Sequence, residues 1–356
     1  MKRLWFFYPE NDIALAQGSA NFTAPAAAVA LRMAGEILPV WMAAAGDRVL
    51  CHGINEAWFN EVRTRYGVEA DVWNHNEFDF MPTPWGWSAA SRRVFEDNGF
   101  SADDLPDDGL LERYRQLSHR RTSASFAGML ATRLPWVESG VLEVSDIDEL
   151  AHILSDGLPH VLKSPWSSSG RGVRFVDAGK ADEALRQAVG TIRRQGSVMV
   201  EPFVAGRTDF AMLYYVQDGR AHYRGLSVFA TDIATGRYVG NIVAAQNVLY
   251  NKLSHVIDAA RLDILADNTG ELLESLIGSS YDGPVGVDFM ASADGTVHVA
   301  EINLRYTMGF LSLSLGRLVP AGEEYIYEII RGVDVPPGAI RLTPPSAVMQ
   351  FVLRPI

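Results

Sequence analysis

Two short segments joined by a tight turn constrain the fold more strongly than any other part of this chain. The segments are Val285–Met290 and Val297–Arg305, and the turn between them contains Ala293-Asp-Gly295. Polar residues alternate with apolar ones in both segments, which is typical of strands because successive side chains point to opposite faces. The pattern predicts an antiparallel hairpin, which fixes the side chains that lie next to one another.

Three oxygen-bearing side chains lie on this hairpin: Asp288, Glu301 and Asn303. Pairing across the turn can bring Asp288 beside Glu301, and two adjacent carboxylates repel one another unless a cation lies between them. Carboxylate and amide oxygens are ligands that Mg²⁺ takes together with nucleotide phosphates. The hairpin therefore predicts a metal site, and the alternative is a pair of solvated acids on an edge hairpin.

A second candidate site begins where the predicted strand Val161–Lys163 runs into the loop Ser164–Gly172. A lysine at a strand end can point its ammonium at phosphate oxygens, while N–H groups of a small-residue loop close over them. The loop has neither the GxxxxGK[ST] nor the GxGxxG pattern, so it predicts neither a P-loop nor a Rossmann dinucleotide site. A hairpin turn beside a surface lysine explains the loop equally well. The loop residues predicted to contact the nucleotide are Ser168, Ser169, Gly170 and Gly172.

A third candidate is the apolar segment Val198–Val204, which contains Glu201. Backbone groups at the end of such a strand can bond the edge of an adenine, and apolar side chains such as Phe203 can enclose its ring. Glu201 can accept a hydrogen bond from the exocyclic amine. A core strand whose acid caps a turn is an equally good explanation.

The first third of the chain alternates predicted strands with predicted helices. This β-α-β-α-β order predicts a small parallel sheet with loops for a ligand at the carboxyl ends of its strands. Asn11 and Asp12 follow the first strand at such an end, although an Asx-type turn after Pro9 is the better-supported explanation. The predicted strands are Leu4–Tyr8, Arg48–Cys51 and Ala70–Trp73, the predicted helices are Ala26–Ala45 and Glu56–Tyr66, and a polar loop is expected from Glu10 to Pro25.

After Glu143 the pattern changes to an α+β layout, in which long alternating strands mix with helices. A chain of 356 residues is long enough for two or three domains. The predicted strands here include Asp209–Gln217 and His222–Phe229, and the predicted helices are Asp146–Leu154, Lys180–Arg194, Leu253–Leu276 and Glu323–Ile330.

Composition limits the partners and the location of the protein. The formal net charge of −12 argues against nucleic acid as the main partner, because phosphate binding depends on clustered Lys and Arg. Cys51 is the only cysteine, which excludes an internal disulfide and fits a reducing compartment. There is no signal-peptide pattern and no apolar run of about 18 residues. We therefore expect a cytoplasmic protein without a membrane partner.

In this order, the motifs resemble those of the ATP-grasp superfamily, which includes D-alanine–D-alanine ligase and biotin carboxylase. The resemblance covers roughly residues 115–320 and implies one role for each motif. Lys163 and its loop cover the phosphates, Glu201–Val204 holds the adenine, and the hairpin holds two magnesium ions. The resemblance adds Asp209 near the ribose and places Arg121 where many members have a first ATP-binding lysine, although arginine departs from the commoner residue.

The resemblance also implies the fold class, the cofactors and the reaction. It implies an ATP-grasp fold, α/β and α+β, with boundaries at 1–110 for a small parallel-sheet domain like the one that precedes the grasp, 111–200 for the small subdomain with the flap, and 201–356 for the large subdomain with the magnesium clamp. The cofactors would be ATP and Mg²⁺, with Mn²⁺ as an alternative metal. The reaction would activate a carboxylate as an acyl phosphate and join it to an amine or similar nucleophile, with Lys163 and Arg305 as catalytic residues.

Two other functions remain open at this stage. One is a phosphotransferase of the same fold that acts on a small molecule without forming an acyl phosphate. The other is a nucleotide-binding module without turnover, which the joint presence of Lys163, Asp288, Glu301 and Asn303 argues against. A homodimer is also left open, and the sequence does not identify the acid or the nucleophile.

Overall fold

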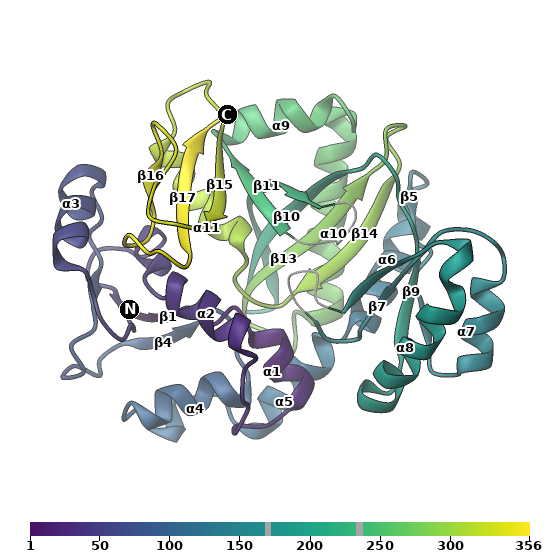
Figure 1. The fold of residues 1–356 in the computed structure, drawn as a ribbon, viewed down its shortest axis with the longest axis horizontal. Coiled ribbons are helices and arrows are strands. Elements are labelled where there is room, and N and C mark those ends of the chain that lie inside the picture. The colour runs from purple at the N-terminus through teal and green to yellow at the C-terminus, as the bar shows by residue number, and fades with distance from the viewer. Residues whose placement is uncertain (168–171, 233–237) are drawn as a thin grey trace.

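The computed structural model describes residues 1–167, 172–232 and 238–356, and its strands form three sheets (Figure 1). Ser168, Ser169 and Gly170, which the sequence predicts to contact nucleotide, lie outside the described residues. Across the described chain, no helix is both long enough and apolar enough to cross a membrane.

The N-terminal sheet has four strands in the order β3-β2-β1-β4, all of them parallel. This confirms the predicted parallel sheet, and β4 is an added strand that its prolines concealed. Its elements are β1 (Arg3–Phe6), α1 (Asn11–Gln17), α2 (Ala26–Gly35), η1 (Leu38–Trp41), β2 (Arg48–Val49), α3 (Glu56–Tyr66), β3 (Asp71–Val72) and β4 (Met81–Pro84).

Two predictions in this region, one of a loop and one of a helix, were wrong. The expected polar loop after Pro9 contains helix α1, which buries Ala14 and Leu15 and ends at Gly18 in a left-handed conformation. The expected long helix from Ala26 stops at Gly35 and continues only as a 3₁₀ turn. It stops because Pro39 has no N–H to donate to the carbonyl four residues earlier.

The central sheet has nine strands in the order β16-β17-β15-β12-β11-β10-β13-β14-β5. Neighbouring strands are antiparallel except β14 and β5, which are parallel. Its strands are β5 (Val137–Glu138), β10 (Thr208–Gln217), β11 (Arg220–Thr231), β12 (Tyr238–Val243), β13 (Gly283–Ala291), β14 (Val297–Asn303), β15 (Tyr325–Ile330), β16 (Ile340–Arg341) and β17 (Gln350–Pro355).

Two further predictions were wrong here. The segment Glu323–Ile330 was expected to be a helix, but Tyr325–Ile330 forms strand β15 between β12 and β17. Its aromatic and β-branched residues suit a strand that has a partner on each side. The single helix expected at Leu253–Leu276 is two helices, because Asp258 caps a new helix by accepting from the N–H of Ala260.

The two faces of the central sheet pack against different layers. One face lies against α6, α9 and α10, around buried residues such as Phe210 and Phe289. The other face carries Ala211 and Leu213 and shares a core with the N-terminal sheet and α11. Asp288 belongs to this second face, because its neighbours Val287 and Phe289 point into the first. The helices are α6 (Arg120–Arg133), α9 (Gln246–Ser254), α10 (Ala259–Ile277) and α11 (Met308–Leu315).

The third sheet has the order β6-β9-β7-β8, is antiparallel, and packs with α7 and α8 around a small apolar core. Figure 1 shows β7 and β9 between these helices and β14, the strand that carries Glu301 and Asn303 and is called the clamp strand below. The elements are β6 (Leu142–Val144), α7 (Ile147–Leu154), β7 (His160–Lys163), β8 (Val173–Val176), η3 (Ala178–Lys180), α8 (Ala181–Gln195) and β9 (Val198–Pro202). The remaining elements are α4 (Ala89–Asp97), η2 (Ala102–Asp104), α5 (Asp108–Leu117) and η4 (Gly316–Leu318).

Candidate functional site

The hairpin of β13 and β14 pairs Asp288 with Glu301 and Gly286 with Asn303. The predicted juxtaposition of the two acids is therefore confirmed. A β-bulge between Asp288 and Phe289 interrupts the ladder at this point, and such bulges re-aim side chains next to functional sites.

Asp288 is the most perturbed acid of this pair. Burial, followed by repulsion from Glu301, raises the pKa of the Asp288 carboxyl to about 7, although Arg305 and Asn303 act in the opposite direction. Asn303 donates from Nδ2 to Asp288 Oδ2 at 3.0 Å. A buried acid that repels its neighbour gains most from a bound cation.

The donor set on the hairpin fits Mg²⁺ that is also bound to phosphate. No group of three or more His, Cys, Asp or Glu side chains within the described ranges could hold a metal by itself. The hairpin offers two carboxylates and one amide, and Mg²⁺ usually takes one or two protein carboxylates together with substrate phosphates and water. Asp288, Glu301 and Asn303 would be the residues that hold it, and that role remains a prediction.

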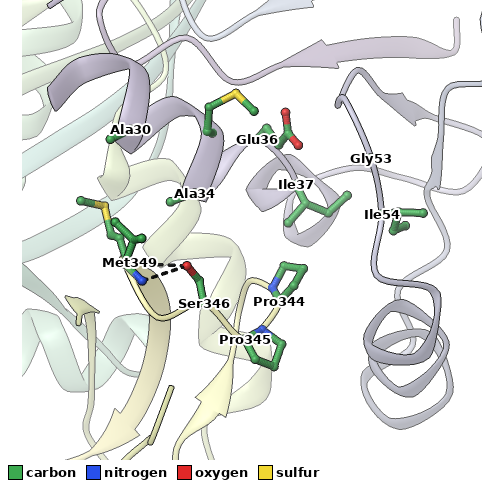
Figure 2. A pocket seen from close by; sticks show the side chains of 12 residues that line it. Ala30, Ala34, Glu36, Ile37, Gly53, Ile54, Pro344, Pro345, Ser346 and Met349 are labelled. Carbon is green, nitrogen blue, oxygen red and sulfur yellow. Dashed lines mark hydrogen bonds between the residues drawn. The ribbon is translucent and has the colours of Figure 1, made fainter. Parts of the chain in front are cut away.

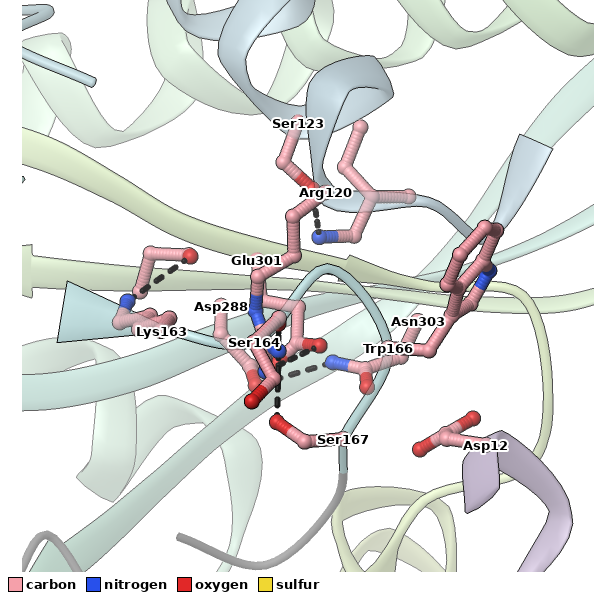
Figure 3. A network of polar contacts seen from close by, with 12 residues as sticks. Asp12, Arg120, Ser123, Lys163, Ser164, Trp166, Ser167, Asp288, Glu301 and Asn303 are labelled. Atoms are coloured by element: carbon pink, nitrogen blue, oxygen red, sulfur yellow. Dashed lines mark hydrogen bonds and ion pairs between the residues drawn. The ribbon is translucent and has the colours of Figure 1, made fainter. Parts of the chain in front are cut away.

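Arg120 is a site residue that the sequence did not reveal. Its side chain is 5% exposed and its Nη2 lies 2.8 Å from Glu301 Oε1. Its Nη1 donates to the carbonyl of Ser164 at 2.5 Å and to Ser167 Oγ at 2.6 Å. Arg120 therefore joins helix α6, the start of the loop after β7, and Glu301 (Figure 3).

Arg121, the arginine that the resemblance selected, points elsewhere. Its side chain is 60% exposed and its Nη2 lies 2.7 Å from Glu143 Oε1. Helical periodicity could have separated the two arginines. Arg120, Ser123, Ala127 and Leu130 recur at helical spacing and share the buried face of α6.

Lys163 reaches the clamp strand from the third sheet. Its Nζ lies 2.5 Å from Glu201 Oε2 and 3.3 Å from the carbonyl oxygen of Ala300. Ala300 precedes Glu301, so the Lys163–Glu201 pair lies against the stretch of β14 that carries Glu301. The side chains of Lys163 and Glu201 are only 12% and 6% exposed.

The other predicted nucleotide residues have contacts of their own. Phe203 packs edge-on against Phe175, with ring centroids 5.6 Å apart, and Val204 is buried. Asp209 accepts from Arg207 Nε at 2.9 Å and from Thr231 Oγ1. The roles of these residues toward a nucleotide remain predictions.

Gly172, the last residue of the loop after β7, pairs with the first residue of that loop, Ser164. Its carbonyl accepts from the N–H of Ser164 at 2.9 Å, and its φ is +74°. A Cβ at this position would lie 2.6 Å from Ser164 Oγ, so the closure requires glycine.

Arg305 follows the clamp strand and binds Asp12 of helix α1. Its Nε donates to both carboxylate oxygens at 2.9 Å and its Nη2 donates to Oδ2 at 2.7 Å. Nη2 also donates to Asn303 Oδ1 at 2.8 Å. Burial opposes the charge on Arg305, but Asp12, Glu301 and Asp288 together outweigh it, so the pKa of the guanidinium lies above its ordinary value.

Trp85 and Gly86, which follow β4, lie against the segment that contains Arg305 and Tyr306. The N–H of Tyr306 donates to the carbonyl of Trp85 at 2.7 Å, which ties the clamp to the N-terminal sheet. At Gly86 a Cβ would lie 2.5 Å from Asn11 Nδ2 and 2.9 Å from Arg305 Cβ. Gly86 thus permits the close approach of the N-terminal sheet to the clamp.

An apolar pocket of about 340 Å³ lies apart from these residues, between α2 and the segment before β17 (Figure 2). Its walls include Ala34, Ile37, Pro344 and Met349. None of the candidate site residues described above is among its lining residues, so the pocket does not bear on the clamp.

Several solved structures are similar in fold to this chain over its whole length. Biotin carboxylase from Campylobacter jejuni, in a β,γ-ATP complex, matches at a TM-score of 0.55 and 10% identity, over 100% of this chain and 88% of that one. N5-carboxyaminoimidazole synthetase from Staphylococcus aureus, with ADP, matches at 0.51 and 12%, over 100% and 94%. The biotin carboxylase domain of 2-oxoglutarate carboxylase from Hydrogenobacter thermophilus, with MgADP, ADP and bicarbonate, matches at 0.52 and 12%, over 100% and 86%.

No protein-family model and no curated protein sequence matches this chain. The structural neighbours are ATP-grasp enzymes, and their full-length agreement shows that this chain has the ATP-grasp fold with an N-terminal parallel-sheet layer. The resemblance inferred from the motifs is therefore confirmed at the level of fold. At these identities the comparison does not extend to the substrate.

Proposed function

We propose that this protein is an ATP-dependent ligase that activates a carboxylate as an acyl phosphate and joins it to an amine or similar nucleophile. One observation carries the proposal: the Lys163 ammonium lies 3.3 Å from the Ala300 carbonyl, and the next residue along β14 is paired with Asp288. The Lys163 ammonium and the paired acids therefore lie near one stretch of β14, which supports a phosphate-binding cation beside a metal site. The named structural neighbours, crystallised with adenine nucleotides, support this proposal.

In the proposed mechanism the protein positions charged groups and neutralises their charge. Lys163 and Arg120 bind phosphate oxygens, and Glu201 accepts from the adenine amine once Lys163 turns from it to the phosphates. Bound magnesium would neutralise charge on the transferred phosphoryl group. Arg305 faces the γ-phosphate, which the substrate carboxylate attacks with release of ADP. The nucleophile then attacks the acyl carbon of the acyl phosphate, loses its proton and displaces inorganic phosphate.

The proposed reaction is tested by product analysis with Mg²⁺ and ATP. A panel of small carboxylic acids and amino acids is incubated with the protein and hydroxylamine, which converts acyl phosphates into hydroxamates. Hydroxamate formed together with ADP supports the ligase, whereas a stable phosphorylated product without hydroxamate would indicate the phosphotransferase. Nucleotide binding without any product across the panel would favour a module without turnover.

A further inference from the structure

The proposed mechanism gives no role to Asp12, yet Asp12 forms the most extensive ion pair of the site. Asp12 and Arg305 make three hydrogen bonds, and each side chain is only 13% exposed. The pair joins helix α1 beside the N-terminal sheet to the residue just beyond β14. Such a buried pair is weak support for stability alone, because desolvation of both charges offsets much of their attraction.

Arg305 has two other acids within electrostatic reach. Glu301 and Asp288 both act on the Arg305 guanidinium, and Arg305 acts in turn on Asp288. Arg305 already touches Asn303. Asn303 in turn touches Asp288 (Figure 3). The guanidinium therefore contacts one proposed metal ligand, Asn303, and is one residue removed from another, Asp288.

The other cations of the site have acids of their own. Glu301 is paired with Arg120 and Glu201 with Lys163. Asp288 is different: the group that donates a hydrogen bond to it is the neutral Asn303 amide, and its paired neighbour across the hairpin is another acid, Glu301. If Arg305 lost Asp12, Asp288 would be the acid that gains most from pairing with it, because an unpaired buried guanidinium is strongly disfavoured.

We propose that Asp12 is a positioning residue that holds Arg305 away from Asp288 and Glu301, so that their oxygens stay available to a divalent cation. The inference rests on the proposed function, since it assumes that these acids hold nucleotide-bound magnesium. It assigns a role to the N-terminal layer: one carboxylate from α1 keeps an internal cation from competing with the metal. Partners of this kind typically change metal affinity by about 10- to 100-fold.

The test measures how much Mg²⁺ the full-length protein needs to bind ADP. ADP is used because Arg305 is assigned to the transferred phosphate, which ADP lacks. Calorimetric titrations at a series of Mg²⁺ concentrations compare wild type, Asp12→Asn, Arg305→Gln and the double variant. We expect Asp12→Asn to need about tenfold more Mg²⁺ for half-maximal binding, and Arg305→Gln to restore the wild-type requirement in the double variant.

A matched control is Arg3→Met. Arg3 Nη1 donates to Tyr306 Oη at 2.9 Å, so this substitution removes another contact between the N-terminal sheet and the same segment without changing charge at the clamp. We expect its Mg²⁺ requirement to equal that of wild type. An increase like that of Asp12→Asn would show that loosening of this contact, and not competition by Arg305, causes the effect, and would overturn the inference.

Three other results would also overturn it. They are an unchanged Mg²⁺ requirement in Asp12→Asn, a lower requirement in that variant, and failure of the double variant to recover. If Asp12→Asn does not fold, Asp12→Ser replaces it: a raised Mg²⁺ requirement that Arg305→Gln reverses supports competition, and an unchanged requirement contradicts it. Absence of ADP binding by wild type at every Mg²⁺ concentration would instead overturn the proposed function.

Discussion

At the scale of single residues, the site is a set of charges whose partners decide their chemistry. Lys163 and Glu301 each have a close counter-charge, whereas Asp288 is held by an amide and is repelled by its neighbour. A carboxyl group in that position holds its proton more tightly than it would in the unfolded chain. The raised pKa of Asp288 should therefore affect both the stability of the protein and its binding of a metal ion.

Without divalent cations, Asp288→Asn should make the protein more stable at pH 8. The pKa of Asp288 is raised from 3.8 to about 7 in the folded protein, so the folded state binds more protons than the unfolded state between these values. The contribution of Asp288 to wild-type stability should therefore fall as pH rises from about 4 to about 7. Each unit of pKa is about 1.4 kcal/mol, so the gain at pH 8 should be on the order of a few kcal/mol.

Urea unfolding of both proteins at pH 5 and pH 8 measures this difference. Asp294→Asn, in the turn of the same hairpin, is the control, because the pKa of Asp294 is lowered by backbone hydrogen bonding and not raised. If Asp288→Asn is no more stable than wild type at pH 8, the ionised Asp288 carboxylate does not destabilise the folded protein.

Asp288→Asn and Glu301→Gln should each abolish ATP turnover while leaving the fold intact. A loss of at least about 100-fold is expected, because a neutral amide replaces one of two metal carboxylates. ADP release in the presence of Mg²⁺ measures turnover, and far-ultraviolet circular dichroism checks the fold. Turnover close to that of wild type in either variant would remove that residue from the metal role.

At the scale of elements, helix α6 determines which of two adjacent arginines enters the site. The buried face of the helix carries Arg120 and Ser123, and Ser123 Oγ accepts from the N–H of Ile302 at 2.9 Å. The helix therefore docks on β14 through one polar contact at each of two neighbouring residues, Glu301 and Ile302. The next arginine projects to the third sheet.

Arg120→Met and Arg121→Met form a matched pair on this helix. The first should weaken nucleotide binding by about tenfold or more, because it leaves a partly buried acid without its cation and frees the start of the flap loop. The second should change affinity by about twofold or less, since exposed ion pairs contribute little. Calorimetry with ADP and Mg²⁺ compares them, and a larger loss at position 121 would restore the assignment based on resemblance.

At the scale of the whole molecule, the N-terminal sheet does not have a core of its own. Buried residues Phe7 and Trp41 share one cluster with Tyr327 and Phe351 of the central sheet. Trp41 Nε1 also donates to the carbonyl of Leu342 at 2.8 Å. The boundary near residue 110 therefore crosses a continuous apolar core.

A fragment of residues 1–110 should consequently fail to fold cooperatively. Removal of residues 111–356 would expose the apolar side chains that face the central sheet, and a small domain has little stability to lose. Dye binding to exposed apolar surface and the chemical-shift dispersion of amide protons would measure this. A sharp two-state unfolding transition in the isolated fragment would contradict the shared core.

The sequence by itself determined the local elements and the closest pairs of site residues. Strand alternation and an Asp-Gly turn are local features, so the hairpin and the pairing of Asp288 with Glu301 followed from them. The first parallel sheet followed from the order of its elements. These patterns need only the chain direction and the periods of helix and strand.

Tertiary structure alone decided which distant charges meet. Arg305 and Asp12 are 293 positions apart, and nothing in their local sequences selects one for the other. The same holds for strand β15, whose aromatic and β-branched residues became a strand because β12 and β17 supply hydrogen-bond partners on both sides. Such pairings form because buried charges and backbone groups must find partners within the folded chain, and packing of the whole molecule determines which partners are within reach.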